Sequence, residues 1–121
     1  SLWTKQFFNS LYQILDNNGM LLTYSNSAAV RNAMLQNDFY VGKIYIPEIN
    51  KFMGTVATKN PDLIEHKLSE IEIGLINSKA GICYEDENLD LSNSIILKNR
   101  TEKVKHSSLI SSAKYLRGFK K

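Results

Sequence analysis

The stretch Trp3–Ile46, WTKQFFNSLYQILDNNGMLLTYSNSAAVRNAMLQNDFYVGKIYI, decides the fold of this 121-residue chain. Apolar residues recur at helical spacing in its first part, which predicts an amphipathic helix over Trp3–Leu15. The segment Asp16–Gly19 ends this helix, and Gly19 is expected to take the left-handed conformation that closes it. Met20–Tyr24 is a short apolar run without strict alternation, which is typical of a strand covered on both faces.

A second helix and two further strands follow. Three polar residues suit the N-cap of that helix: Ser25, Asn26 and Ser27. Phe39–Ile46 and Phe52–Thr58 are rich in residues that favour strands, with Gly54 as a weak point or a bulge. The connection between these two strands is short, which predicts an antiparallel pair, because a parallel return needs a crossover of about a dozen residues.

Several short motifs in this order resemble one protein family. They are Leu2-Trp3-Thr4, the loop that ends at Gly19, Thr23-Tyr24-Ser25, the Ala-rich helix with Val30-Arg31, and Lys51-Phe52-Met53-Gly54-Thr55-Val56-Ala57. Together they resemble the C-terminal half of the S-adenosylmethionine-dependent methyltransferase domain of the tRNA wobble-uridine enzymes that form 5-methylaminomethyl-2-thiouridine. The match covers roughly residues 2–58 and, more loosely, 68–84. The resemblance implies that Phe52–Thr58 lies between Met20–Tyr24 and Phe39–Ile46.

The expected fold is therefore α/β. It is a partial Rossmann-like methyltransferase sheet of three strands, mixed in direction, with flanking helices and a small helical C-terminal extension. Residues 1–60 would form the methyltransferase-like part, residues 61–106 the helical extension, and residues 107–121 a basic tail, for which order and disorder are both open.

The family's donor-binding motifs do not occur in these 121 residues. A full methyltransferase domain needs roughly 200 residues or more, which indicates a truncated reading frame, a split protein or an excised fragment. The leading hypothesis is the C-terminal portion of a tRNA wobble-uridine methyltransferase, inactive alone, with S-adenosylmethionine as the family's cofactor but not tightly bound here. The alternative is a non-catalytic RNA-binding or assembly module.

Composition agrees with a cytoplasmic protein without a membrane span, since the chain is 43% hydrophobic, 22% charged and has a single cysteine, Cys83. Charge is unevenly distributed. Residues 98–121 contain eight Lys or Arg and only one acidic residue, whereas the first 97 residues are net acidic.

Six residues are candidates for the substrate side of a site. They stand at or near the ends of the predicted strands: Thr23, Tyr24, Ser25, Asn26, Arg31 and Lys51. Ligands of open α/β sheets bind outside the carboxyl ends of the strands, which favours a binding role. The competing interpretation is that Ser25–Ser27 only cap a helix, that Arg31 lies on a solvent face, and that Lys51 is a rim residue. No catalytic residue is indicated.

The basic tail supplies a second group of candidates, for contact with tRNA: Lys114, Tyr115, Arg117, Lys120 and Lys121. Basic residues interleaved with an aromatic ring suit RNA backbone contact and base stacking. An equally good interpretation is a solvated C-terminus.

No metal site is expected. Asp86, Asn88 and Asp90 have the spacing of the first calcium ligands of an EF-hand, but the positions that require Gly and Glu hold leucines, which favours a solvated acidic loop. His66 and His106 stand apart from other ligand residues.

Self-association is expected because Met20–Tyr24 would lie at an open sheet edge. The partner would be a second copy of the chain or a protein that supplies the missing half.

Overall fold

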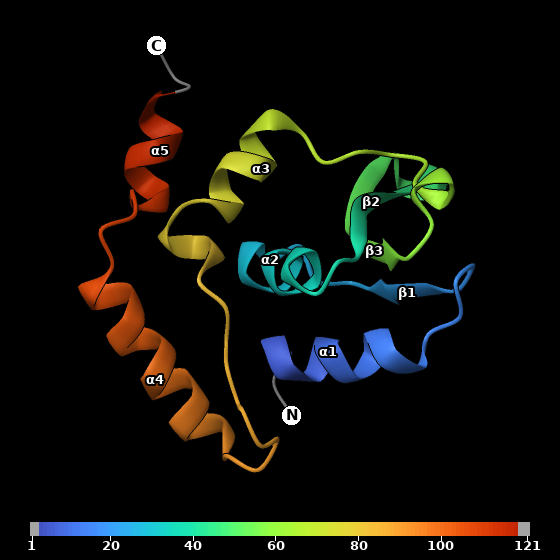
Figure 1. Ribbon diagram of the computed structural model, residues 1–121. Coiled ribbons are helices and arrows are strands. Elements are labelled where there is room, and N and C mark those ends of the chain that lie inside the picture. The colour runs from blue at the N-terminus through green and yellow to red at the C-terminus, as the bar shows by residue number, and fades with distance from the viewer. Residues whose placement is uncertain (1–2, 119–121) are drawn as a thin grey trace.

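The computed structural model describes residues 3–118, and Figure 1 shows their arrangement. The helices and strands are α1 (Lys5–Ile14), β1 (Met20–Thr23), α2 (Ala28–Gln36), β2 (Tyr40–Ile46), β3 (Lys51–Thr58), α3 (Glu70–Ile76), α4 (Asn93–His106) and α5 (Ser112–Gly118). Short 3-10 turns occur at Pro47–Ile49, Pro61–Leu63 and Lys79–Gly81. The predicted α/β class and the small helical extension are confirmed.

The three strands form one sheet in the order β1-β3-β2. This is the predicted order, and the predicted antiparallel pairing of β2 with β3 is also present. The expectation of a mixed sheet was wrong in one respect. Both ladders are antiparallel. Strands β1 and β2 run in the same direction, but β3 lies between them and runs in the opposite direction.

Helices α1 and α2 cover one face of the sheet (Figure 1). The core between them consists of buried side chains from both helices, the sheet and the later chain: Phe8, Val30, Ala33, Met34, Phe39, Ala57 and Cys83. Thr4 begins α1 by accepting a hydrogen bond from the Phe7 amide at 3.1 Å, and Ser27 begins α2 in the same way. The apolar faces of these helices and their N-caps, of which the sequence predicted that of α2, account for this layer.

Two expectations about the start of the sheet were wrong. Strand β1 is covered on one face only: Leu21 packs against the core, whereas Met20 and Leu22 on the other face are 51% and 58% exposed. Gly19 does not adopt a left-handed conformation, because α1 ends at Leu15 in an extended conformation and Gly54 is the glycine with positive φ among residues 3–118. The Gly19 amide instead closes a turn onto the Asp16 carbonyl at 2.9 Å.

After β3 the chain crosses back to the free edge of β2 and pairs with it there. The Lys43 amide donates to the His66 carbonyl at 2.9 Å, and Gly42 forms a bridge with Lys67. A Cβ atom at Gly42 would lie 2.6 Å from both the His66 carbonyl oxygen and the Ile64 side chain, so the glycine permits this close approach. The crossing segment covers β2 and leaves the outer face of β1 open.

The C-terminal helices are more ordered than the sequence predicted. Helix α3 begins with a capping box, in which the Ser69 side chain accepts from the Glu72 amide and the Glu72 carboxylate accepts from the Ser69 amide. The basic tail, whose order the sequence left open, contains α5, and this helix lies beside α3. The Tyr115 hydroxyl donates to the Glu70 carbonyl at 3.1 Å. Tyr115 gives α5 an anchor that the charged composition did not reveal. Within residues 3–118, no helix has the length and apolar character needed to cross a membrane.

Candidate functional site

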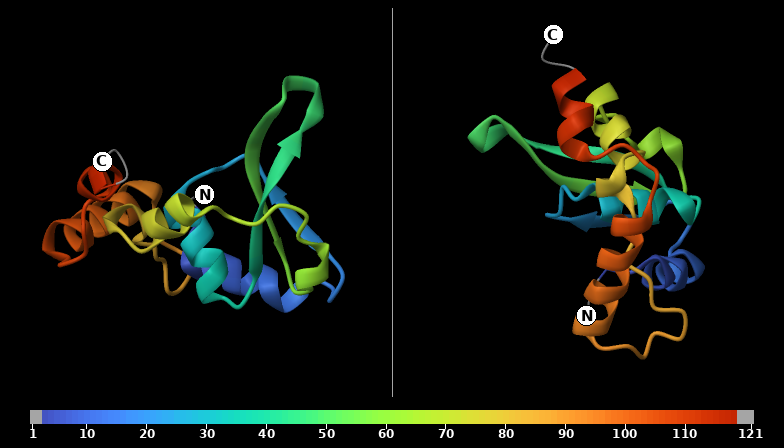
Figure 2. Two further views of the ribbon diagram at one scale, coloured as in Figure 1. Left: turned by 90° about the horizontal axis from the view of Figure 1, so that it is seen from above. Right: turned by 90° about the vertical axis from the view of Figure 1, so that its left-hand side faces the viewer.

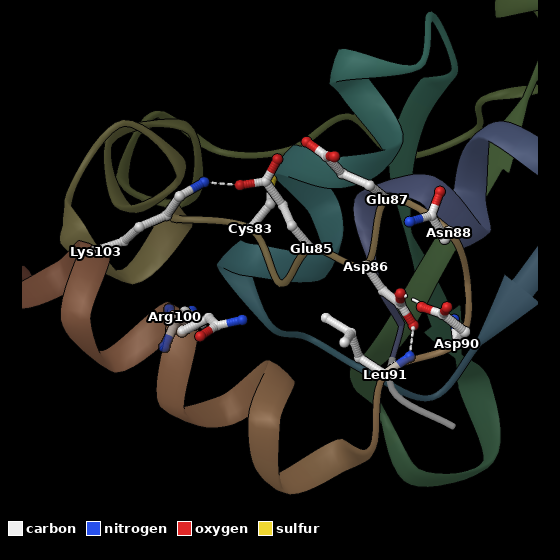
Figure 3. A pocket seen from close by; sticks show the side chains of 10 residues that line it. Cys83, Glu85, Asp86, Glu87, Asn88, Asp90, Leu91, Arg100 and Lys103 are labelled. Atoms are coloured by element: carbon white, nitrogen blue, oxygen red, sulfur yellow. Dashed lines mark hydrogen bonds and ion pairs between the residues drawn. The ribbon is translucent and has the colours of Figure 1, made fainter.

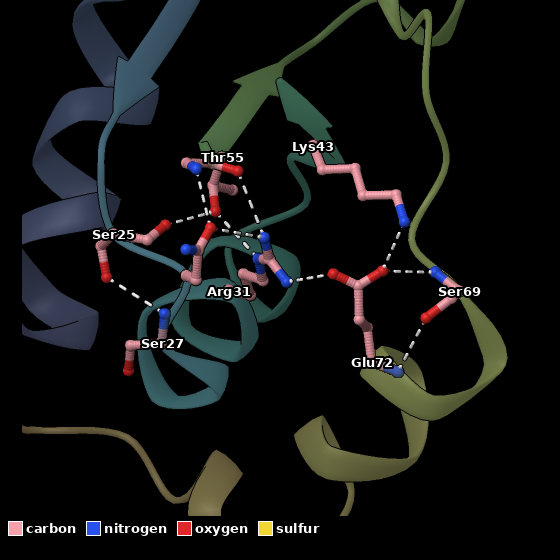
Figure 4. A network of polar contacts seen from close by, with 9 residues as sticks. Ser25, Ser27, Arg31, Lys43, Thr55, Ser69 and Glu72 are labelled. Carbon is pink, nitrogen blue, oxygen red and sulfur yellow. Dashed lines mark hydrogen bonds and ion pairs between the residues drawn. The ribbon is translucent and has the colours of Figure 1, made fainter. Parts of the chain in front are cut away.

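The carboxyl ends of β1 and β2 lie at the same edge of the sheet, next to the first residues of β3. Figure 4 shows the polar side chains that meet there. In open α/β sheets this edge is where ligands bind. The structure brings together Thr23, Ser25, Asn26 and Arg31, as the strand ends predicted, but chiefly as partners of one another and of neighbouring elements.

Hydrogen bonds fix the turn between β1 and α2. The Ser25 amide donates to Thr23 Oγ1 at 3.2 Å, and the Ser27 amide donates to Ser25 Oγ at 3.1 Å. The hydroxyl of Thr55 on β3 donates to the Ser25 carbonyl at 2.7 Å. Ser27 also caps α2 through the Val30 amide at 3.4 Å. These polar groups therefore hold the turn in one conformation.

A bulge in β3 receives this turn. The pairing register between β2 and β3 shifts between Lys43 and Tyr45, and Gly54 lies in the shifted part with φ of 99°. A Cβ at this position would lie 2.3 Å from the Thr23 carbonyl oxygen. The Gly54 amide donates to Asn26 Oδ1 at 2.7 Å. The glycine that the sequence marked as a weak point is the residue that lets β3 meet the turn.

Arg31 is buried, contrary to both sequence-based interpretations of it. Its guanidinium donates to Thr55 Oγ1 at 2.8 Å, to Asn26 Oδ1 at 3.3 Å and to the Gly54 carbonyl at 3.2 Å. The remaining nitrogen, Nη1, donates to Glu72 Oε2 at 2.8 Å. Arg31 therefore neither decorates a solvent face nor points freely toward a ligand, because its donors are used within the fold.

Glu72 is the residue that sequence analysis missed at this edge. It belongs to α3, yet its carboxylate accepts from Arg31 and, at 3.0 Å, from Lys43 Nζ on β2. Burial acts to raise the pKa of Glu72, but hydrogen bonds from Ser69, Lys43 and Arg31 outweigh it and lower the pKa to about 2. The capping box identified Glu72 as a local cap, and no local signal indicated its partners on α2 and β2.

Three of the six substrate-side candidates are exposed to solvent. The Tyr24 side chain is 82% exposed directly after β1, and Lys51 is exposed at the start of β3. Asn26 is exposed as well, although its Oδ1 accepts from the Gly54 amide and from Arg31. Tyr24 and Lys51 stand at the rim of a rigid polar network whose other members are satisfied internally. Such an edge can present an aromatic ring and a cation to a ligand while the network beneath keeps its shape.

The tail candidates divide into two groups. Lys114 and Arg117 are exposed on α5, whereas the Tyr115 hydroxyl is directed to α3. Lys120 and Lys121 lie outside the described residues. The described cations could contact phosphate, but Tyr115 is not a freely exposed ring for stacking.

The loop expected to be solvated and acidic has a buried centre, shown in Figure 3. Asp86 is buried, and its carboxylate accepts from the amides of Asp90 and Leu91 at 3.0 and 3.1 Å. Its own amide donates to Gln6 Oε1 at 2.6 Å, which attaches the loop to α1. Asp86 is thus a structural residue of this loop, and the description of the loop as solvated was wrong at this position.

A polar hollow of about 470 Å³ lies between this loop and α4. Lys103 pairs with Glu85 across it, and Arg100 donates to the Ile82 and Ala80 carbonyls at 2.7 and 3.1 Å. Burial raises the pKa of the Cys83 thiol, which makes it a poor nucleophile. No group of three His, Cys, Asp or Glu residues within 3–118 has the arrangement of a metal site. Among the side chains that line this hollow, Lys103, Glu85, Arg100 and Asp86 have partners within the fold.

Comparison with known proteins identifies the class to which this arrangement is similar. Residues 1–60, which contain α1 to β3 and most of the polar network, match the model of a family described as S-adenosyl-L-methionine-dependent methyltransferase. This part of the chain is therefore similar to methyltransferases of that family.

The similarity extends to a particular enzyme. The crystal structure of MnmC2 from Aquifex aeolicus resembles this chain with a TM-score of 0.75 and 30% sequence identity, covering 88% of this chain and 34% of that one. Uncharacterized protein MJ0670 of Methanocaldococcus jannaschii is 28% identical over 120 residues, which is 96% of this chain and 33% of the relative. The chain spans about a third of the length of each. The resemblance predicted from the sequence is confirmed.

Proposed function

We propose that this chain is the substrate-side, C-terminal portion of an S-adenosylmethionine-dependent methyltransferase that acts on an amine carried by a tRNA wobble uridine in the cytoplasm. The observation that carries the proposal is the likeness to MnmC2, which extends over 88% of this chain at 30% identity. The matched region includes the carboxyl edge of the sheet, where substrates of α/β enzymes lie.

In this proposal the chain positions the substrate and does not provide the donor site. Methyl transfer requires the amine nitrogen in line with the donor methyl group, and holding the two reactants in this geometry is a large part of catalysis. The network of Arg31, Glu72 and Asn26 would keep the edge rigid, and Tyr24 and Lys51 would contact the substrate at its rim.

The residues of this chain do not fit S-adenosylmethionine on their own. The two closest of its six glycines, Gly74 and Gly81, are seven residues apart, which is incompatible with the glycine-rich loop that cradles such ligands. The first amides of α1 and α2 are already capped by Thr4 and Ser27. We therefore propose that another polypeptide segment supplies the donor site, and that this chain alone is inactive.

Reconstitution tests this proposal. The chain is titrated with S-adenosylmethionine in a calorimeter, alone and after mixing with the part of Aquifex aeolicus MnmC2 that the chain does not cover. We expect no binding alone, and binding together with methyl transfer to amine-bearing tRNA in the mixture. Micromolar binding of S-adenosylmethionine by the isolated chain would contradict the proposal that another polypeptide segment supplies the donor site. A donor-binding mixture that methylates no tRNA would contradict the substrate assignment.

A non-catalytic RNA-binding or assembly module is the second candidate. The observation in its favour is the exposed Lys114 and Arg117 on α5, an element anchored to α3 rather than loose. The two functions separate in the reconstitution, because an assembly module would bind tRNA without stimulating methyl transfer.

A further inference from the structure

The hairpin of β2 and β3 extends beyond the carboxyl end of β1, as Figure 2 shows from above. Strand β1 ends at Thr23, opposite Thr55, whereas the ladder of β2 and β3 continues to the pair of Ile46 and Lys51. The extended part therefore overhangs the edge at which the substrate is proposed to lie.

Three aromatic rings gather on this hairpin and the segment that crosses it. Tyr45 and Phe52 are cross-strand partners with ring centroids 5.2 Å apart, and His66 lies 5.3 Å from Phe52 and 5.9 Å from Tyr45. We call Tyr45, Phe52 and His66 the hairpin aromatic cluster. Sequence analysis missed it because His66 approaches only through the crossing segment.

The cluster is preorganised and accessible. Its rings meet at interplanar angles of 61°, 75° and 54°, so none of them is stacked face to face on another. The Tyr45 hydroxyl donates to Asn50 Oδ1, and Lys43 Nζ lies 4.4 Å from the Phe52 centroid. Phe52 is 47% exposed, although a ring that served only the core would be buried.

A hollow of about 180 Å³ adjoins the cluster. It runs from His66 and Tyr45 to the open face of β1, where Met20 and Leu22 line it. Pockets for drug-sized ligands begin at about 300 Å³, so this one suits a single planar ring system rather than a larger molecule.

Two cations flank the cluster. Lys51 precedes Phe52 and Lys67 follows His66 in the chain, and both are exposed. No ion pair of either lysine is found among residues 3–118. An exposed ring such as Phe52 beside lysines without an ion pair is a combination by which proteins stack unpaired bases and contact the adjoining phosphates.

We propose that the hairpin aromatic cluster binds an unpaired base of the RNA substrate, with Lys51 and Lys67 on the neighbouring phosphates. The inference takes its substrate class from the proposed function. It assigns single-strand recognition to the hairpin, whereas the sequence pointed to the basic tail. Glu65 also lines the hollow, so the occupant is inferred from the rings and the lysines together and not from charge alone. An unpaired base with its phosphates would use both, whereas an apolar protein surface would leave the flanking lysines unused.

Fluorescence anisotropy with a labelled single-stranded oligouridylate tests the proposal on the full chain. Phe52→Ala should weaken binding about tenfold, because it removes the ring on which the base would stack. Phe52→Tyr keeps a ring and should retain binding. Tyr40→Ala is the matched control, because Tyr40 is equally exposed, at 49%, but stands at the opposite end of β2. Circular dichroism shows that each variant is folded.

Each outcome is decisive. The proposal is supported if Phe52→Ala weakens binding of the oligonucleotide, Phe52→Tyr retains it and Tyr40→Ala leaves it unchanged. Equal effects of Phe52→Ala and Tyr40→Ala, or equally tight binding of the same sequence in duplex form, would overturn it. Failure of the wild-type chain to bind the oligonucleotide would also overturn it, while the reconstituted methyl transfer would still report separately on the proposed function.

Discussion

Arg31 Nη1 and Glu72 Oε2 lie 2.8 Å apart although 41 residues separate them in the chain. The pair joins the carboxyl edge of the sheet to α3, which the sequence assigned to a separate extension. Because Arg31 also bonds Asn26 and the Gly54 carbonyl, Glu72 supports the turn at the candidate site from outside the methyltransferase-like part. The integrity of this edge therefore depends on the extension.

Glu72→Gln should lower the free energy of unfolding by about 1–3 kcal/mol. Removing one partner of a fully buried pair costs about 3–5 kcal/mol, and we expect less here because the Glu72 side chain is 23% exposed. Glutamine still completes a capping box, so the change isolates the charge. Urea unfolding measures the effect, with Glu70→Gln on the exposed part of the same helix as the control. Equal midpoints for the two variants would show that the pair contributes no net stability.

The same carboxylate predicts a component of acid unfolding. The pKa of Glu72 is lowered in the folded state to about 2 from the ordinary 4.5, so its contribution is complete above about pH 4.5 and is lost as the pH falls toward 2. The wild-type chain should lose stability over this range more steeply than Glu72→Gln. Urea midpoints at several pH values measure the difference. Parallel curves for the two proteins would contradict the lowered pKa.

Gly54→Ala should destabilise the chain by about 1–3 kcal/mol, since alanine at φ of 99° is strained and its Cβ would meet the Thr23 carbonyl oxygen. Gly118→Ala is the control, because nothing lies within 4 Å of a Cβ there. Thermal melting compares them. A Gly54→Ala variant as stable as Gly118→Ala would mean that the bulge relaxes without cost.

Local signals predicted most of the elements of this fold. The apolar faces of α1 and α2, the caps at Ser27 and Ser69, and the short connection before β3 each follow from neighbouring residues. The strand order needed the family resemblance, because three strands alone allow several arrangements.

The candidate site was less predictable, for a physical reason. Arg31 is a charged residue in a polar stretch, and its partners come from β3, from the turn after β1 and from α3, none of which its neighbours in the sequence indicate. The partners of Glu72 and the position of His66 likewise depend on how the chain after β3 returns to the sheet. Sequence patterns report which residues share an element but not which distant elements meet.

The two described tail cations provide a further test of RNA binding. The double change of Lys114 and Arg117 to Gln should flatten the salt dependence of tRNA binding, with the slope falling by about 0.7 to 0.9 for each lost phosphate contact. Substitution is preferable to truncation, because α5 is attached to α3 through Tyr115. The matched control changes Lys98 and Lys105 on α4 to Gln. An unaltered slope in the tail variant would assign α5 a purely structural role.

The open edge of β1 supports the last prediction, that the isolated chain forms a two-fold dimer. Among the described strands, β1 pairs with β3 alone, and its exposed Met20 and Leu22 carry no charge that would discourage pairing with another chain. The aromatic residues of α1 contribute less than the sequence suggested, because Phe8 is fully buried. Ile14, at 78% exposure, extends the apolar surface instead.

Sedimentation equilibrium at tens of micromolar should give about twice the chain mass of 13.8 kDa for the wild type. Leu22→Lys should be monomeric, because a charge on the β1 edge opposes pairing with a second copy. Leu97→Lys on α4 is the control, since Leu97 is exposed to a similar degree, at 46%, but lies away from the sheet. A donor-binding segment that uses the same edge should dissociate the dimer when it is added. A wild-type monomer, or a dimer that Leu22→Lys leaves intact, would show that another surface governs association.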